Sequence, residues 1–399
     1  MIKLSQRVSE LKPSPTLALA AKAKELKAQG NDVISLSVGE PDWDTFDSVK
    51  KAAKQAIDDG ITKYTPANGT PELRQAICDQ TNSDLGTKYG PNDVTVSTGG
   101  KFIIFAALQS VVDPGDEVVI PAPYWVSYPT MVELAGGVPV IAQTKKQDRF
   151  KLTADGLKQV LTSKTKAVIL NTPSNPTGEV YTAEELDAVA KVLREHPNVC
   201  VLSDDIYNRL VFNESGLAPH LLKQAPDLLD RTLVINGVAK TYSMTGWRVG
   251  WALGPQEVIK AMTKYQSQSV SCACSIAQQA ALVAIRDGQP EVQAALKKLK
   301  ERRDLVYSKV SQLPHVSVEA PEGAFYIWPD FSYYLGRAWK GKQLATSSDL
   351  AAAILEDQMV AAVPGIEFGE EGYLRISYAL SPQRMEEAIG RIAQFLNQL

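Results

Sequence analysis

Residues 232–251 read TLVINGVAKTYSMTGWRVGW. The first five residues, with Leu, Val and Ile at their centre, are typical of a buried strand. A turn of small residues follows and presents Lys240, and Arg248 comes eight residues later within GWRVG. A lysine in such a turn is well placed to offer its amine to a ligand, and the planar fork of arginine suits a phosphate group. We therefore expect an anion-binding site where this strand ends.

Similar apolar runs precede this segment and alternate with helical patterns. Strands are expected at 94–98, 117–121, 138–142, 166–171 and 199–204, and helices at 102–112, 126–134 and 183–194. Thr182, followed by Glu184 and Glu185, is typical of a helix N-terminus. Strands rich in Val and Ile on both faces suit a sheet that is covered on both sides. The alternation predicts an α/β fold with a mainly parallel sheet.

The pattern changes after about residue 290. A long charged, amphipathic helix is expected at 291–313, followed by shorter strands mixed with helices. The N-terminal segment, with a helix near 17–28, is expected to pack with this part. The sequence thus predicts a large domain at 46–290 and a smaller α+β domain formed by 1–45 and 291–399.

Composition narrows the class of protein. The 399 residues suit two domains at the usual size of roughly 100–200 residues each. The 42 basic and 45 acidic residues give a net charge of -3, which argues against nucleic-acid binding through bulk charge. Four cysteines and three histidines without metal-ligand spacing predict no metal site. With neither a secretory signal nor a long apolar run, we expect a cytoplasmic protein.

Three further polar segments follow predicted strands, where open α/β sheets bind ligands. They are TGGKF at 98–102, NTPSNPTG at 171–178 and SDDIY at 203–207. The first could cradle a phosphate at a helix N-terminus or be a plain turn. The second could hold Asn175 rigidly or be a Pro/Gly turn; the bonds Ala122–Pro123 and Asn175–Pro176 are candidates for cis. The third ends a strand with Asp204, which needs a cation or donors unless it caps a helix.

Taken together, these motifs resemble the fold-type I pyridoxal-phosphate (PLP) aminotransferases, in the class I aspartate aminotransferase branch. The lysine segment matches that family's G-V-A-K-x7-R-V-G signature. The segments NPTG, SDDIY and YLRISY follow in the family's order, and SLSVGEPD (35–42), KYTPANGTPELR (63–74) and PAPYWVSYP (121–129) are also similar. The resemblance covers nearly the whole chain. It implies a large domain with a seven-stranded type of sheet.

The resemblance implies roles around the cofactor ring. Lys240 would be the Schiff-base lysine and would carry a proton to and from the substrate. Asp204 would pair with the ring nitrogen, which makes the ring an electron sink. Tyr207 and Asn175 would hydrogen-bond the ring oxygen, and Trp125 would stack on the ring and border the substrate. Without the resemblance, Trp125, Tyr64 and Tyr207 would be interpreted as aromatic residues of the hydrophobic core.

Other roles concern the phosphate and the subunit arrangement. Arg248 and the backbone of Gly100 and Lys101 would hold the phosphate. Tyr64 would reach the phosphate of a neighbouring subunit, which implies a homodimer with shared sites.

The implied substrate site includes Arg375, which would clamp the α-carboxylate beside Gly39 and Asn175. Segment 267–275 offers no counterpart of the partner-subunit arginine that some members use for a distal carboxylate. The chain is closer to the branch in which Lys101, with Ser14 and Thr16, would recognise acidic substrates. A solvated surface lysine is the alternative.

Two departures from the family's pattern stand out. Gly237 and Ala239 replace a hydroxyl residue before the lysine, and GIEFG (365–369) replaces a run of smaller residues. The first change removes a potential contact to the phosphate or the lysine and so bears on affinity. The second bears on the shape of the pocket wall.

The resemblance implies ping-pong transamination in amino-acid metabolism, with L-aspartate as donor and 2-oxoglutarate as acceptor. The alternatives keep the cofactor: another donor (an aromatic amino acid, alanine, or prephenate/arogenate), or another reaction at Cα such as β-lysis. A PLP-binding regulator would need a DNA-binding domain for which the chain has no room. A nicotinamide enzyme would need a G-x-G-x-x-G motif that the sequence lacks.

Overall fold

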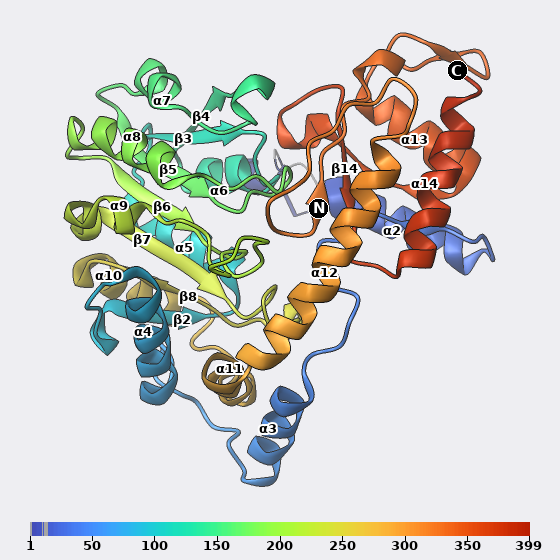
Figure 1. The fold of residues 1–399 in the computed structure, drawn as a ribbon. Coiled ribbons are helices and arrows are strands. Elements are labelled where there is room, and N and C mark those ends of the chain that lie inside the picture. Colours follow the sequence, from blue (N-terminus) through green and yellow to red (C-terminus); the bar gives the residue numbers. More distant parts are fainter. Residues whose placement is uncertain (1, 10, 12–14) are drawn as a thin grey trace.

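A seven-stranded sheet forms the centre of the larger part of the molecule (Figure 1). The computed structural model describes residues 2–9, 11 and 15–399. In spatial order the strands are β2 (Val94–Ser97), β8 (Gly250–Leu253), β7 (Thr232–Gly237), β6 (Cys200–Asp204), β5 (Thr165–Asn171), β3 (Glu117–Ala122) and β4 (Val138–Gln143). Neighbouring strands are parallel except at β8, which runs antiparallel to β2 and β7. The predicted α/β fold with a mainly parallel sheet is confirmed.

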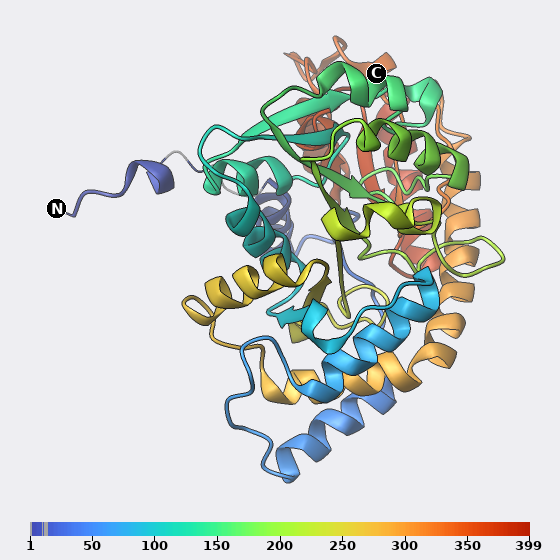
Figure 2. The ribbon, with the colours of Figure 1, turned by 90° about the vertical axis from the view of Figure 1, so that its left-hand side faces the viewer.

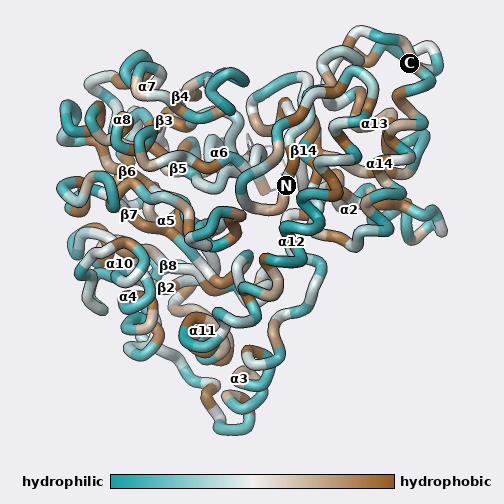
Figure 3. Tube along the Cα trace, viewed as in Figure 1, coloured by the Kyte–Doolittle hydropathy of each residue, from teal (hydrophilic) through white to brown (hydrophobic). Residues whose placement is uncertain are grey.

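Both faces of this sheet are buried. Within β6, Val201 belongs to one apolar cluster and Leu202 to the other, so successive side chains enter opposite layers. One layer contains α5 (Gly100–Val111), α6 (Tyr128–Leu134) and α10 (Gln256–Ser267). The other contains α3 (Asp47–Asp58), α4 (Pro71–Leu85), α7 (Ala154–Val160), α8 (Ala183–Arg194), α9 (Leu221–Gln224) and α11 (Ser275–Asp287). Figure 3 shows the hydrophobic residues gathered along the strands and the polar ones on outer helices such as α7.

A second part of the chain has its own core. That cluster draws mainly on residues 34–36 and 299–396, so both ends of the chain contribute to it. Its helices are α2 (Pro15–Ala28), α12 (Gln289–Val310), α13 (Ser347–Gln358) and α14 (Pro382–Leu396). Its strands form small sheets: β13 (Val363–Pro364), β14 (Leu374–Ser377) and β9 (Tyr326–Ile327); β1 (Ile34–Ser35) and β12 (Val360–Ala361); β10 (Ala338–Trp339) and β11 (Lys342–Gln343).

The long helix α12 runs from α11 toward α14 and joins the two parts (Figure 1). Because the two core systems separate near its first turn, we propose the boundaries expected from the sequence, 46–290 and 1–45 with 291–399. Figure 2 shows the short helix α1 (Gln6–Ser9) projecting away from the body of the molecule. No helix in the described part of the chain is long and apolar enough to cross a membrane.

Candidate active site

A pocket opens where the parallel strands of the large sheet end, facing the second part of the chain. Most of the residues singled out in the sequence line it: Gly39, Gly100, Lys101, Trp125, Asn175, Asp204, Tyr207, Lys240, Arg248 and Arg375. They come from seven separate segments of the chain. The fold therefore brings together side chains that the sequence places far apart.

Asp204 is the last residue of β6, the middle strand of the sheet, and its side chain is buried. The hydroxyl of Tyr128 donates to its Oδ2 at 2.5 Å, and the backbone N–H of Ile206 lies 3.3 Å from its Oδ1. Burial raises the pKa of Asp204 to about 6, and the Tyr128 hydrogen bond opposes that rise. A carboxylate in this setting can accept a hydrogen bond from a protonated nitrogen of a ligand.

Lys240 follows β7 and projects into the same pocket. Its amine donates a hydrogen bond to the backbone carbonyl of Gly39. Burial lowers the pKa of Lys240 to about 8, while the nearby carboxylate of Glu40 opposes this shift. An amine with such a pKa is partly neutral near physiological pH, so it can act as a nucleophile and can carry a proton.

An anion cradle lies beside the lysine. Helix α5 begins at Gly100, and the N–H groups of a helix's first residues have no partner within the helix. Gly99 has a φ of +95°, and a Cβ there would lie 2.7 Å from an Arg248 guanidinium nitrogen. A Cβ on Gly250 would collide with the backbone of Gly99 and Gly100. Only glycine fits at these positions, which lets Arg248 and the free N–H groups approach one ligand.

Arg375 lies on β14 and is only 3% exposed. Its guanidinium donates to Asn175 Oδ1 at 3.0 Å and to the Ser37 carbonyl at 2.8 Å. Burial lowers the pKa of Arg375. In the described part of the chain its hydrogen bonds go to neutral oxygens, and its Nε has none. This leaves a buried cation to meet a ligand carboxylate, for which the arginine fork is suited.

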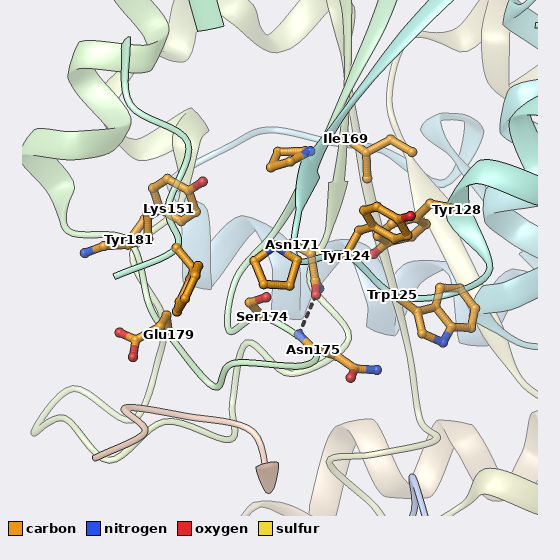
Figure 4. Close-up of a pocket in the computed structure, with 13 residues that line it drawn as sticks. Tyr124, Trp125, Tyr128, Lys151, Ile169, Asn171, Ser174, Asn175, Glu179 and Tyr181 are labelled. Carbon is orange, nitrogen blue, oxygen red and sulfur yellow. Dashed lines mark hydrogen bonds between the residues drawn. The ribbon is translucent and has the colours of Figure 1, made fainter. Parts of the chain in front are cut away.

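Asn171, at the end of β5, orders the floor of the site. Its side chain accepts the N–H of Asn175 at 2.9 Å, which Figure 4 shows as a dashed line, and donates to the Asp204 carbonyl at 2.8 Å. Tyr207 shares a 3.0 Å hydrogen bond with the hydroxyl of Tyr326. At the rim, the Lys101 amine lies 4.9 Å from the centre of the Trp125 ring. The arrangement thus combines an amine, a buried carboxyl, an anion cradle and an aromatic wall.

Comparisons with known proteins agree with this geometry. Residues 31–392 match the model of the family "Aminotransferase class I and II". The chain belongs to this family. It is 48% identical to an aspartate/prephenate aminotransferase of Cereibacter sphaeroides and 45% identical to an aspartate aminotransferase of Geobacillus stearothermophilus, each over 99% of both chains.

Solved structures show the same relationship for this aminotransferase. The aspartate aminotransferase of Rhizobium meliloti superimposes with a TM-score of 0.96 at 41% identity, over 100% of both chains. The Thermus thermophilus aspartate aminotransferase with maleate has a TM-score of 0.92 at 40% identity, covering 99% of this chain and 100% of the other. The expected fold and family are therefore confirmed.

The predicted roles of Tyr64, Ser14 and Thr16 in the aminotransferase are not tested by the geometry of this pocket. Tyr64 lies on a loop away from it and is 91% exposed. Ser14 lies outside the described residues. Thr16 lies in helix α2, but its side chain is outside the description as well. Their predicted roles stay predictions.

Sequence reasoning missed several pocket residues of the aminotransferase, among them Tyr128, Asn171 and Tyr326. Tyr128 stands three residues after Trp125 in PYWVSYP, and that helical spacing was the available signal. Within residues 15–399 the cis peptide bonds are Ala122–Pro123, as expected, and Thr172–Pro173. The expectation for Asn175–Pro176 is wrong. In the described chain, no group of three or more His, Cys, Asp or Glu residues could hold a metal ion.

Proposed function

We propose that this aminotransferase uses PLP to move the amino group of L-aspartate to 2-oxoglutarate by a ping-pong mechanism, and that it works as a homodimer. The observation that carries the proposal is one pocket that unites the Lys240 amine, the Asp204 carboxyl and the two guanidinium groups of Arg248 and Arg375. A cytoplasmic location remains an expectation from the sequence.

The donors of the pocket fit the parts of PLP. The cradle of Gly99, Gly100 and Arg248 has room and free N–H groups for a phosphate, because glycine keeps Cβ atoms out of it. Asp204 is a buried carboxyl with capacity for a protonated ring nitrogen. Trp125 offers an aromatic face and Lys240 an amine. The residues present therefore fit this cofactor.

The residues divide the work of transamination. When bound, PLP supplies an electron sink for the electron pair left on the substrate Cα. Arg375 binds the substrate α-carboxylate and orients the Cα–H bond, Lys240 Nζ accepts the Cα proton and later returns a proton, and Asp204 holds the proton of the ring nitrogen. Asn175 and Tyr207 donate hydrogen bonds to the ring oxygen.

Lys101 is our candidate for the distal carboxylate of aspartate. It lies beside Trp125 in the wall of the pocket, where a ligand carboxylate can reach its amine. Burial lowers its pKa, with Arg248 contributing in the same direction. The names of the relatives and the maleate-bound Thermus structure support an acidic substrate. Ser14 and Thr16 are proposed to assist.

An absorbance spectrum tests the cofactor and the donor together. Purified protein reconstituted with PLP should show a visible band, and L-aspartate without any oxo acid should replace it by the band of the pyridoxamine form. A visible band that aspartate leaves unchanged would refute aspartate as donor. The absence of any band with added PLP would refute the cofactor.

Substituting Lys101 tests the distal contact. Lys101→Ala should lower kcat/KM for aspartate by about tenfold to a hundredfold, as expected for one lost charged contact, and change alanine or phenylalanine turnover little. Lys101→Arg, which keeps the charge, is the matched control. Equal losses for acidic and neutral donors would contradict the assignment.

Prephenate is a second candidate substrate, because the 48% identical relative is named for both aspartate and prephenate. We expect prephenate to serve as amino acceptor with aspartate as donor. Measuring the aminated product with prephenate in place of 2-oxoglutarate decides this point, and absence of product would remove prephenate.

A further inference from the structure

The two oxygens of Asp204 have unequal surroundings. Oδ2 accepts the hydroxyl of Tyr128 at 2.5 Å, whereas among the described residues Oδ1 has only the Ile206 N–H, at 3.3 Å. Tyr128 and Asp204 are 2% and 5% exposed, and Asp204 lines the pocket. A carboxylate oxygen can accept two hydrogen bonds. Oδ1 therefore keeps most of its capacity for a ligand, while Oδ2 is already engaged.

The charge on Asp204 depends on this contact. Burial and the neighbouring carboxylate of Asp205 oppose the charged form, and Tyr128, Ile206 and Lys240 favour it. Among the favourable contacts, the Tyr128 hydrogen bond has the largest effect on the pKa of Asp204. Asp205 itself is turned away, toward Ser203 at 2.7 Å and His220 at 3.0 Å.

Tyr128 is a reliable donor in a fixed place. Burial, together with the charge of Asp204, raises the pKa of Tyr128 well above its usual value, so the hydroxyl keeps its proton. Tyr128 is the first residue of α6, its N–H donates to the Trp125 carbonyl at 3.0 Å, and its ring meets the Trp125 ring edge-on at 5.3 Å. Figure 4 shows the two side chains next to each other on this wall of the site.

We propose that Tyr128 is a positioning residue: it engages Oδ2, keeps the Asp204 carboxylate charged, and leaves Oδ1 to the protonated ring nitrogen of the cofactor. The inference rests on the proposed use of PLP. Nothing in the sequence motifs assigns this role, since the contact joins residues 76 positions apart.

The test uses Tyr128→Phe, which removes one oxygen and keeps the ring. Apoprotein is titrated with PLP labelled with 15N in the ring, following tryptophan fluorescence for affinity and 15N NMR for the ring nitrogen. Affinity should fall by about tenfold to a hundredfold, the usual effect of losing a hydrogen bond to a buried charge. The 15N signal should move toward that of an unprotonated pyridine.

Tyr124→Phe is the matched control, because Tyr124 is a neighbouring tyrosine with no hydroxyl contact to Asp204 recorded in the described chain. Its affinity should stay within about twofold of the wild type. A Tyr128→Phe protein with wild-type affinity and an unchanged 15N signal would overturn the inference. Failure of the wild type to bind PLP would instead overturn the proposed function.

A double-mutant cycle separates positioning from general damage to the fold. In an Asp204→Asn background, Tyr128→Phe should cost no further affinity, because its effect passes through the carboxylate. A further loss as large as that of the single variant would show a role independent of Asp204. This readout holds even if Tyr128→Phe alone folds poorly, since the double variant no longer buries a carboxylate.

Discussion

Three ionisable residues of the pocket, Lys240, Asp204 and Arg375, are buried at a cost in folding free energy. Burial lowers the pKa of Lys240 to about 8 and raises that of Asp204 to about 6, so both charged forms are disfavoured by their surroundings. Arg375 is buried against neutral oxygens. Groups held in this way reduce the stability of the protein without its ligands, a common consequence of building an active site.

Replacing Lys240 should therefore stabilise the cofactor-free protein. Its pKa falls from 10.5 in the free side chain to about 8 in the fold, so between these values the unfolded chain binds more protons and stability rises with pH. Below pH 8 the buried amine is charged, so its full cost to the free energy of unfolding is present. Lys240→Met should raise the free energy of unfolding at pH 7 by about 1–2 kcal/mol, allowing for solvent screening.

Urea unfolding of both apoproteins at several pH values checks this. The difference between Lys240→Met and the wild type should shrink as the pH approaches 10.5. A difference that is the same at pH 7 and pH 10 would contradict the expected titration.

Whether the sequence predicts a site residue depends on how far along the chain its partners lie. Residues next to a strand end, such as Asp204 and Lys240, stand within motifs and could be named. The partners of Asp204 and Tyr207, namely Tyr128 and Tyr326, lie 76 and 119 positions away. A hydroxyl contact across that separation leaves no local pattern, because it depends on how strands and helices pack.

The strands and helices predicted in the large domain followed their local signals, but other elements were not predicted. Helix α8 begins after Thr182 as predicted, with reciprocal bonds between Thr182 and Glu185. Strand β8 was not predicted, since its four residues, GWAL, are short and carry no alternation. Yet β8 matters for the site: it lies between β2 and β7 and brings Gly250 against the turn that opens α5.

Gly250→Ala tests this contact between elements. The added methyl group would push the Gly99–Gly100 backbone out of position, so affinity for PLP or inorganic phosphate should fall by at least about tenfold. Gly246→Ala is the control, because nothing lies within 4 Å of a Cβ there. Calorimetric titration of the apoproteins measures both. Equal affinities for the two variants would exclude a role of β8 in shaping the cradle.

At the scale of the whole molecule, exposed apolar residues suggest a partner. Ile2, Leu4 and Val8 are 96%, 66% and 54% exposed on the projecting N-terminal segment (Figure 2), and Tyr64 is 91% exposed. The loop of Tyr64 is nonetheless held in shape: buried Gln278 donates to Thr65 at 2.9 Å and accepts the Thr70 N–H at 2.9 Å. A rigid loop that presents a bare tyrosine suits a contact with a second copy of the chain.

Mixed dimers test the shared site. Lys240→Ala chains should show no turnover alone, and Tyr64→Ala chains should load PLP poorly. Unfolding and refolding the two together should restore about a quarter of wild-type activity at limiting PLP, because half of the dimers then contain one site with both residues intact. A mixture no more active than the sum of its parts would refute a Tyr64 contribution across the interface.

Asp204 ends the middle strand of the sheet, with three strands on either side. Sheets lose their outer strands first when they open locally, and amide protons of central strands exchange with solvent last. The carboxyl that we propose to meet the cofactor is therefore anchored in the part of the protein with the slowest expected hydrogen exchange. Local opening at the outer strand β4 would leave that anchor in place, so the Asp204 carboxyl keeps its position while the edge of the sheet exchanges.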